Sequence, residues 1–289
     1  MKTKFLALLE IACVYAVMQV IQIAWRATGI RQWEIANLGW TYTGSLIFVG
    51  VPALFLWLMR RDWVTYGITR AGWQLNLDVG IKAYLVRLIP VVLGLGTALW
   101  FGLGYASLPG GAIIALAELL GIAVMLRLLG RLNEAKAIRS ARANLLTIGL
   151  LLLFPLGVAL AMEKLSILII STVAWQFLCS GFGEEFVWRG YVQSRLNDAF
   201  GCPYHLWGIQ FGVGLGLTSV LFGFFHAFNT YDPALGLASL SWGWALFTTF
   251  SGLFFGILRE KTGSLLGCGL VHGLPDAVGE ALGRLMGWM

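Results

Sequence analysis

Long apolar stretches alternate with short polar connections along almost the whole chain. A helix needs roughly 20 mostly apolar residues to cross the hydrocarbon core of a bilayer. The pattern gives candidate spans at residues 5–25, 38–59, 84–106, 112–129, 145–162, 165–188, 208–228, 237–258 and 264–286. The stretch 145–162 is the weakest of them, because Glu163 and Lys164 leave little room for a turn before the next one. We therefore predict an all-α, polytopic transmembrane helix bundle with about eight spanning helices, within a range of seven to nine.

Composition supports a membrane protein. Of the 289 residues, 58% are hydrophobic and 12% charged, and the mean hydropathy is +0.80. A soluble domain carries about twice that charged fraction. The formal charge of +6 does not indicate a nucleic-acid partner, because excess Lys and Arg in a membrane protein reports topology. The partner that composition predicts is the lipid bilayer.

Basic residues are unequally divided between the two sets of loops. If the nine spans alternate in direction, only Arg26, Arg31, Lys164 and Arg284 lie on the side opposite the N-terminus. Since basic loops stay in the cytoplasm, we expect a cytoplasmic N-terminus. The most basic loop, "RLLGRLNEAKAIRSARAN" at 127–144, is interpreted as a cytoplasmic anchor, with a specific anionic-lipid site as the alternative.

Two adjacent carboxylates follow the apolar run that ends at Phe182. On a helix, Glu185 and Arg189 lie four residues apart on one face and can form a charge-assisted pair. Glu184 is turned by about 100° from Glu185, so helical geometry does not commit it to that pair. An ionisable group at membrane depth is functional by default. The pattern indicates a general base at Glu184. The structural alternative is a network of salt bridges that holds helices together.

Histidine usage adds candidate partners for Glu184. The chain has three histidines, and His226 and His272 lie inside apolar runs. Asp276 follows His272 by one helical turn, whereas His205 lies in a connection and is interpreted as interfacial. Taken together, Glu184, His226 and His272 offer either a two-histidine, one-carboxylate metal site, with zinc as the ion, or a base that activates water.

Three short motifs at apolar helices carry a resemblance to a known family. In chain order they are Glu184-Glu185-x-x-x-Arg189, Phe222-x-x-x-His226 and His272-x-x-x-Asp276. Their types, spacing and order resemble the CPBP intramembrane proteases, which include the type II CAAX prenyl endopeptidases and the bacterial ABI-type relatives linked to bacteriocin processing and immunity. The resemblance implies a catalytic transmembrane core at 145–289, preceded at 1–144 by transmembrane helices with basic cytoplasmic loops.

The resemblance also implies roles for these residues. Glu184 would be the general base for a water held between it and His226, and His272 with Asp276 would stabilise the oxyanion. Glu185 and Arg189 would support Glu184. No cofactor is required by this interpretation; zinc held by Glu184, His226 and His272 is the alternative.

Asp276 departs from the pattern of the family, which commonly has Asn at this position. An ionised Asp would repel a developing oxyanion, so Asp276 has to be protonated, to orient His272 or to ligate a cation.

The depth of His226 sets a geometric condition. If its helix began at Gly208, His226 would lie about 27 Å along it at about 1.5 Å per residue, far from a Glu184 at the cytoplasmic edge. We therefore expect the helix of Glu184 to continue toward Leu196, and the helix of His226 to begin later than Gly208.

The sequence does not select one substrate class. The resemblance implies a membrane-associated protein or peptide, either a C-terminal tail, prenylated or not, or a leader or signalling peptide. The stretch "FGFFHAFN" is more similar to prokaryotic members, which favours a prokaryotic inner or plasma membrane and disfavours a CAAX substrate. Two other functions are retained: a non-catalytic immunity or scaffold protein of the same family, and a proton- or cation-coupled transporter that uses the Glu and His side chains.

Overall fold

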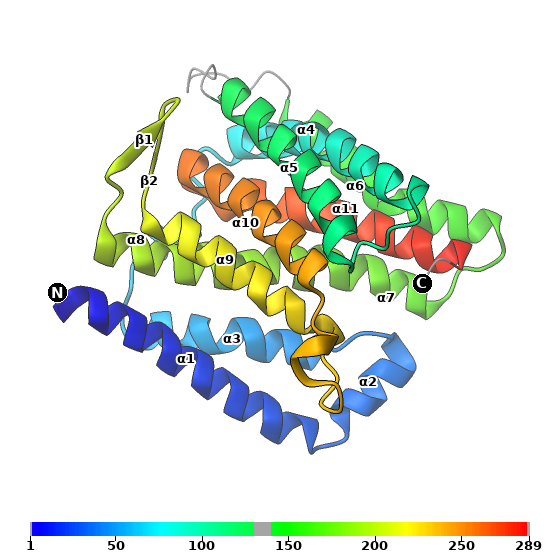
Figure 1. The fold of residues 1–289 in the computed structure, drawn as a ribbon, viewed down its shortest axis with the longest axis horizontal. Helices are drawn as coiled ribbons and strands as arrows, with labels where there is room; N and C mark the ends of the chain where they lie inside the picture. Colours follow the sequence, from blue (N-terminus) through cyan, green and yellow to red (C-terminus); the bar gives the residue numbers. More distant parts are fainter. Residues whose placement is uncertain (1, 130–139, 288–289) are drawn as a thin grey trace. The chain divides into compact units, whose positions relative to one another are not determined.

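The computed structural model describes residues 2–129 and 140–287. Residues 130–139, which include most of the predicted basic anchor, lie outside the described residues. The long helices are α1 (Lys2–Arg26), α3 (Tyr42–Leu58), α4 (Trp73–Trp100), α5 (Leu108–Leu129), α6 (Ala141–Ala161), α9 (Val213–Ala227), α10 (Trp242–Thr262) and α11 (Leu265–Met286). A further continuous helix runs over Ile167–Phe200, and α2 (Ile30–Leu38) is short. Every predicted span coincides with a helix, so the predicted all-α bundle is confirmed (Figure 1).

Within the described residues, six helices are long and apolar enough to cross a membrane. They are Thr3–Arg26, Trp73–Trp100, Leu108–Leu129, Ala141–Ala161, Ile167–Phe200 and Val213–Thr230. The apolar helix α3 is slightly shorter, and α10 and α11 have a comparable length but more polar sequences. The six candidate helices, together with α3, α10 and α11, agree roughly with the seven to nine predicted spans.

Contacts group the chain into two compact units. The first unit comprises Met1–Ile81, Lys136–Val192 and Ser264–Met289, and the second comprises Lys82–Ala135 and Gln193–Gly263. The predicted division of the chain at residue 144 stays a prediction.

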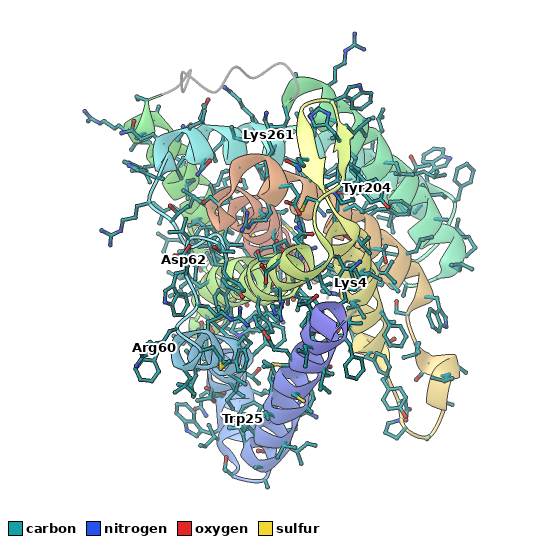
Figure 2. All side chains as sticks on the ribbon, turned by 90° about the vertical axis from the view of Figure 1, so that its left-hand side faces the viewer. Lys4, Trp25, Arg60, Asp62, Tyr204 and Lys261 are labelled. Carbon is teal, nitrogen blue, oxygen red and sulfur yellow. The ribbon has the colours of Figure 1, made fainter. Side chains whose placement is uncertain are left out.

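In the first unit, α1 packs against α2 and α3, and α11 packs against α6 and the helix that begins at Ile167. Lys4 and Trp25 mark the two ends of α1 (Figure 2). The apolar core between α6, α7 (Ile167–Trp175) and α11 consists of Ala159, Ile169, Val173, Ala277, Ala281 and Leu285.

In the second unit, α10 packs against both α5 and α9 (Figure 1). Glycines permit the close approach of α9 to α10, since a Cβ on Gly223 would overlap Thr249. The aromatic side chains of α9 and α10 fill the contact, with Phe222 and Phe255 edge to face at 6.3 Å between ring centroids.

Two helix boundaries agree with those expected for the helices of Glu184 and His226. The helix from Ile167 continues through α8 (Ser194–Phe200) and ends at Gly201, whose φ of 76° only glycine adopts easily. A hairpin follows, in which β1 (Tyr204–Leu206) pairs antiparallel with β2 (Ile209–Phe211) across a two-residue turn. Helix α9 begins at Val213, later than the apolar run that starts at 208, which confirms the expected later start. His226 then lies about 20 Å along α9.

The fourth helix begins earlier than the predicted 84–106. Helix α4 starts at Trp73 and ends at Trp100. The apolar pattern did not predict the first turns, because Asn76 and Asp78 interrupt it there. Both side chains are buried. In the first unit Gly80 lets α4 approach α11, since a Cβ there would lie 3.1 Å from the Cα of Gly267.

Candidate active site

The first motif lies on a π-helical stretch of the long helix. The segments η1 (Gln176–Glu184) and η2 (Phe186–Gln193) are π-helical and surround Glu185. Such wide turns are rare and occur frequently at functional sites. Within the first unit, these turns direct the side chains of Ser180 and Glu185 toward α11. Glu184 borders this contact.

Glycines bring η1 and α11 into direct backbone contact. A Cβ on Gly181 would overlap the backbone of Gly273, and a Cβ on Gly273 would lie 2.7 Å from the carbonyl oxygen of Phe177. Gly269 makes room for the ring of Phe182 in the same way. Because the two helices touch without intervening side chains, polar groups on one helix reach those on the other.

Glu185 is the centre of a hydrogen-bonded chain across this contact. Arg189 Nη1 donates to Glu185 Oε1 at 2.9 Å, as the i,i+4 spacing predicted. His272 Nδ1 lies 2.9 Å from the same oxygen. The side chains of Glu185 and Arg189 are both 0% exposed. The structure therefore joins His272 to Glu185 by a hydrogen bond, a partner that the sequence did not predict for it.

Asp276 extends this chain on the other side of the imidazole. Its Oδ2 lies 3.4 Å from His272 Nε2 and accepts a hydrogen bond of 3.2 Å from Ser180 Oγ. The side chain of Asp276 is 38% exposed. Among the three roles that the sequence allowed for Asp276, this geometry favours orienting His272.

Glu184 lies at the edge of the same cluster. Its side chain is only partly buried, in contrast to Glu185. The charges of His272, Asp276, Glu185 and Arg189 all act on its carboxylate. Glu184 Oε2 is itself withdrawn from solvent, and a carboxylate beside an organised polar cluster has the position that a general base needs.

His226 belongs to the second unit, on the last turn of α9. Its Nδ1 lies 2.8 Å from the carbonyl oxygen of Phe222. A carbonyl only accepts, so Nδ1 carries the proton, and Nε2 is the acceptor nitrogen of the neutral ring. The proximity of His226 to Glu184 stays a prediction. His205 lies in β1 and is exposed.

Metal ligation is the other chemistry that the sequence allowed for the candidate residues. No group of three or more His, Cys, Asp or Glu side chains in residues 2–129 and 140–287 is arranged to hold a metal ion. Both ring nitrogens of His272 face carboxylate oxygens, so ligation by His272 would require it to give up one of these partners. A metal at Nε2 would therefore have to displace or share Asp276, whereas the bond of Nδ1 to Glu185 is compatible with ligation.

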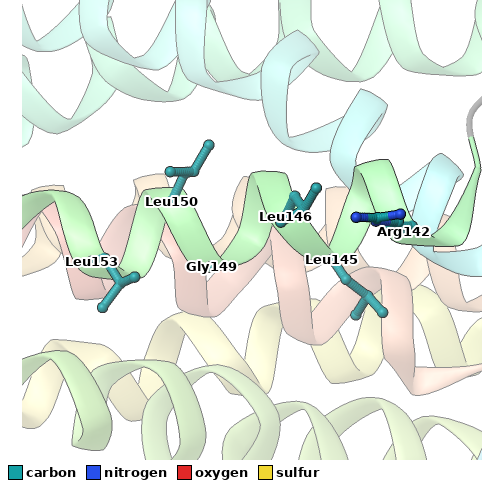
Figure 3. Close-up of a pocket in the computed structure, with 6 residues that line it drawn as sticks. All are labelled: Arg142, Leu145, Leu146, Gly149, Leu150 and Leu153. Carbon is teal, nitrogen blue, oxygen red and sulfur yellow. The ribbon is translucent and has the colours of Figure 1, made fainter.

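A shallow groove on the first unit lies apart from these residues. It runs along one face of α6 and is lined by Arg142, Leu145, Leu146, Gly149, Leu150 and Leu153 (Figure 3). None of the candidate residues lines it. Its exposed leucines are typical of a lipid-facing helix surface.

Sequence reasoning missed Ser180 and the glycine contact. Ser180 has no distinguishing pattern apart from its place one turn before Glu184. The contact, however, has a signal: Gly269 and Gly273 form a G-x-x-x-G pair, which is typical of closely packed membrane helices.

Comparisons with known proteins agree with the motifs. Residues 166–278 match the family model described as "Type II CAAX prenyl endopeptidase Rce1-like". A search of curated proteins and a search of solved structures found no match. The matched region contains all three motifs, from the helix of Glu184 to Asp276. Members of this family are endopeptidases that lie in the lipid bilayer and act on membrane-associated proteins. Residues 166–278 thus match an Rce1-like domain, which supports the resemblance of this region to the CPBP, or CAAX-protease, family, and the apolar helices together with this match point to an integral membrane protein.

Proposed function

We propose that this protein is an intramembrane endopeptidase in which Glu184 activates the hydrolytic water. The observation that carries the proposal is a network of polar side chains across the contact of η1 with α11, next to Glu184. Its members are Arg189, Glu185, His272 and Asp276. Such a network of charged side chains is costly in a membrane protein unless its charges are paired. Its construction beside a further carboxylate, that of Glu184, supports a catalytic role.

In the proposed reaction, the Glu184 carboxylate takes a proton from water as the water oxygen attacks the carbonyl carbon of the peptide. The C–O bond forms and the carbonyl becomes an oxyanion. Collapse of this intermediate breaks the C–N bond, and the proton on Glu184 passes to the departing amine. Nε2 of His226 would accept a hydrogen bond from the same water and orient its lone pair toward the substrate.

Oxyanion stabilisation is proposed for His272, with Asp276 as its orienting partner. Glu185 holds His272 through Nδ1, which directs Nε2 to the side of Asp276. Donation from Nε2 to an oxyanion requires a proton on that nitrogen, and a carboxylate at 3.4 Å is suited to orient it. Arg189 supports the arrangement through Glu185. The proposal requires no metal ion.

The substrate proposed is a membrane-associated protein or peptide, cut near its membrane end. A C-terminal tail, prenylated or not, and a leader peptide are both compatible with this class. We also propose a prokaryotic inner or plasma membrane with the N-terminus in the cytoplasm, on the basis of the loop charges and the similarity of "FGFFHAFN" to prokaryotic members.

The test is a single-turnover cleavage assay in H₂¹⁸O. Protein purified in detergent is mixed with membrane-anchored peptides of both classes, and the products are analysed by mass spectrometry. Direct attack by water places ¹⁸O in the new C-terminal carboxylate during the first turnover, and His226→Ala should abolish product. Failure of the wild-type protein to cleave any of these peptides, with a partner protein bound instead or ion flux in sealed vesicles, would favour the scaffold or transporter alternative.

A further inference from the structure

A buried ion pair lies in the middle of the second unit, outside all three motifs. Arg87 Nε on α4 donates to Glu118 Oε1 on α5 at 2.8 Å. Arg87 Nη2 donates to Ser251 Oγ on α10 at 2.9 Å. Arg87 is 7% exposed, Glu118 0% and Ser251 2%. One guanidinium thus joins three helices through hydrogen bonds to fixed acceptors.

The same guanidinium contacts two aromatic rings of α10. Its Cζ lies 4.9 Å from the ring centroid of Phe255 and 5.8 Å from that of Phe247. A cation within about 6 Å of an aromatic ring is attracted by the ring quadrupole, more strongly where both are withdrawn from water. The ion pair therefore fixes the ring of Phe255 as well as the three backbones.

From Phe255, ring contacts lead directly to the second motif. Phe255 meets Phe222 of α9 edge to face, with 6.3 Å between centroids. Phe222 in turn lies against the ring of His226, at 4.3 Å between centroids, and its carbonyl oxygen accepts from His226 Nδ1. Phe222 is 1% and Phe255 1% exposed, so neither ring has room to turn away.

We propose that the Arg87–Glu118 pair is a positioning device for His226, acting through Phe255 and Phe222. The inference rests on the proposed function, because it requires His226 to act in catalysis. Apolar helices in a bilayer slide and rotate at little cost, since lipid tails are as apolar as the side chains they replace. A guanidinium with two fixed acceptors defines one register of α4, α5 and α10. The aromatic contacts transmit that register to α9 and its imidazole, which packs against the ring of Phe222 and bonds to the carbonyl oxygen of Phe222 within the same helix.

Two matched phenylalanines provide the first test. Both Phe255→Leu and Phe247→Leu remove a ring that contacts Arg87, but only Phe255 contacts Phe222. Cleavage by purified protein is measured with the substrate that the wild type cleaves. Since a displacement of about 1 Å can cost up to about 100-fold in rate, we expect Phe255→Leu to lower kcat at least tenfold with KM unchanged within about twofold. Phe247→Leu should stay close to wild type.

A neutral replacement of the pair distinguishes positioning from mere stability. Replacing a buried ion pair with apolar residues of similar size often preserves or increases stability. The double variant Arg87→Met with Glu118→Leu should therefore fold, yet its kcat should fall as that of Phe255→Leu does. It also keeps the test decisive if Phe255→Leu unfolds. Wild-type kcat in the double variant, or equal losses in the two Phe variants, would overturn the inference. Activity in Glu184→Gln, measured alongside, would instead overturn the proposed function.

Discussion

Replacing Gly273 with alanine should separate the two helices that hold the carboxylate cluster. The added Cβ would lie 2.7 Å from the carbonyl oxygen of Phe177 and 3.2 Å from the Cα of Gly181. Carbon–oxygen contacts settle at about 3.3–3.6 Å, and both opposing atoms belong to backbone. Helix α11 therefore has to move from η1 by about 0.6–0.9 Å.

The energetic and the catalytic consequences can both be estimated. Overpacking costs about 1–3 kcal/mol, while Gly to Ala in a helix returns about 0.5–1 kcal/mol. A displacement of about 0.6 Å also lengthens the His272 Nδ1 to Glu185 Oε1 bond of 2.9 Å to about 3.5 Å, beyond the usual hydrogen-bond range. We therefore expect a net loss of about 0–2.5 kcal/mol and at least tenfold lower cleavage.

Gly279→Ala is the matched control on the same helix, because a Cβ there meets nothing within 4 Å. It gains the same helix propensity without overpacking, so the two variants should differ in free energy of unfolding by about 1–3 kcal/mol. The assay is SDS-induced unfolding in mixed micelles, followed by circular dichroism, together with peptide cleavage. If Gly273→Ala were as stable and as active as Gly279→Ala, the close contact of η1 and α11 would be refuted.

Three further outcomes are expected. Glu185→Gln leaves the buried Arg189 without its carboxylate and should lower the free energy of unfolding by about 3–5 kcal/mol in the same assay; a loss under about 1 kcal/mol would contradict the assigned pair. Asp276→Asn retains an acceptor for Ser180 and should keep cleavage within about tenfold, whereas complete loss would show that the charge of Asp276 is required. Chelator treatment should leave cleavage unchanged, and loss that zinc restores would indicate a metalloprotease.

Hydropathy predicted the helices better than their ends. The apolar runs located every spanning helix, because burial of whole helices in lipid leaves a long signal. The early start of α4 escaped the pattern, since Asn76 and Asp78 are buried within protein and not exposed to lipid. The hairpin 204–211 alternates polar and apolar residues over too few positions to compete with the apolar run that follows it.

Within the site, local pairs were predictable and cross-helix pairs were not. The spacing of Glu185 and Arg189 fixed their pairing because both lie on one helix. The bond of His272 to Glu185 depends on how η1 crosses α11, which sequence spacing does not encode. The π-helical turns also leave no periodic signature, so the directions of Glu184 and Ser180 could be known only from the structure.

The central claim, that the Glu184 carboxylate is the catalytic base, is tested most directly by Glu184→Gln. This change keeps the shape of the side chain and removes only its ability to take a proton. Purified wild-type and variant protein are compared for unfolding in SDS and for cleavage of the same membrane-anchored peptide. The account predicts an unfolding free energy within about 1 kcal/mol of wild type and a loss of cleavage of at least about 100-fold. Cleavage at the wild-type rate by the folded variant would contradict it.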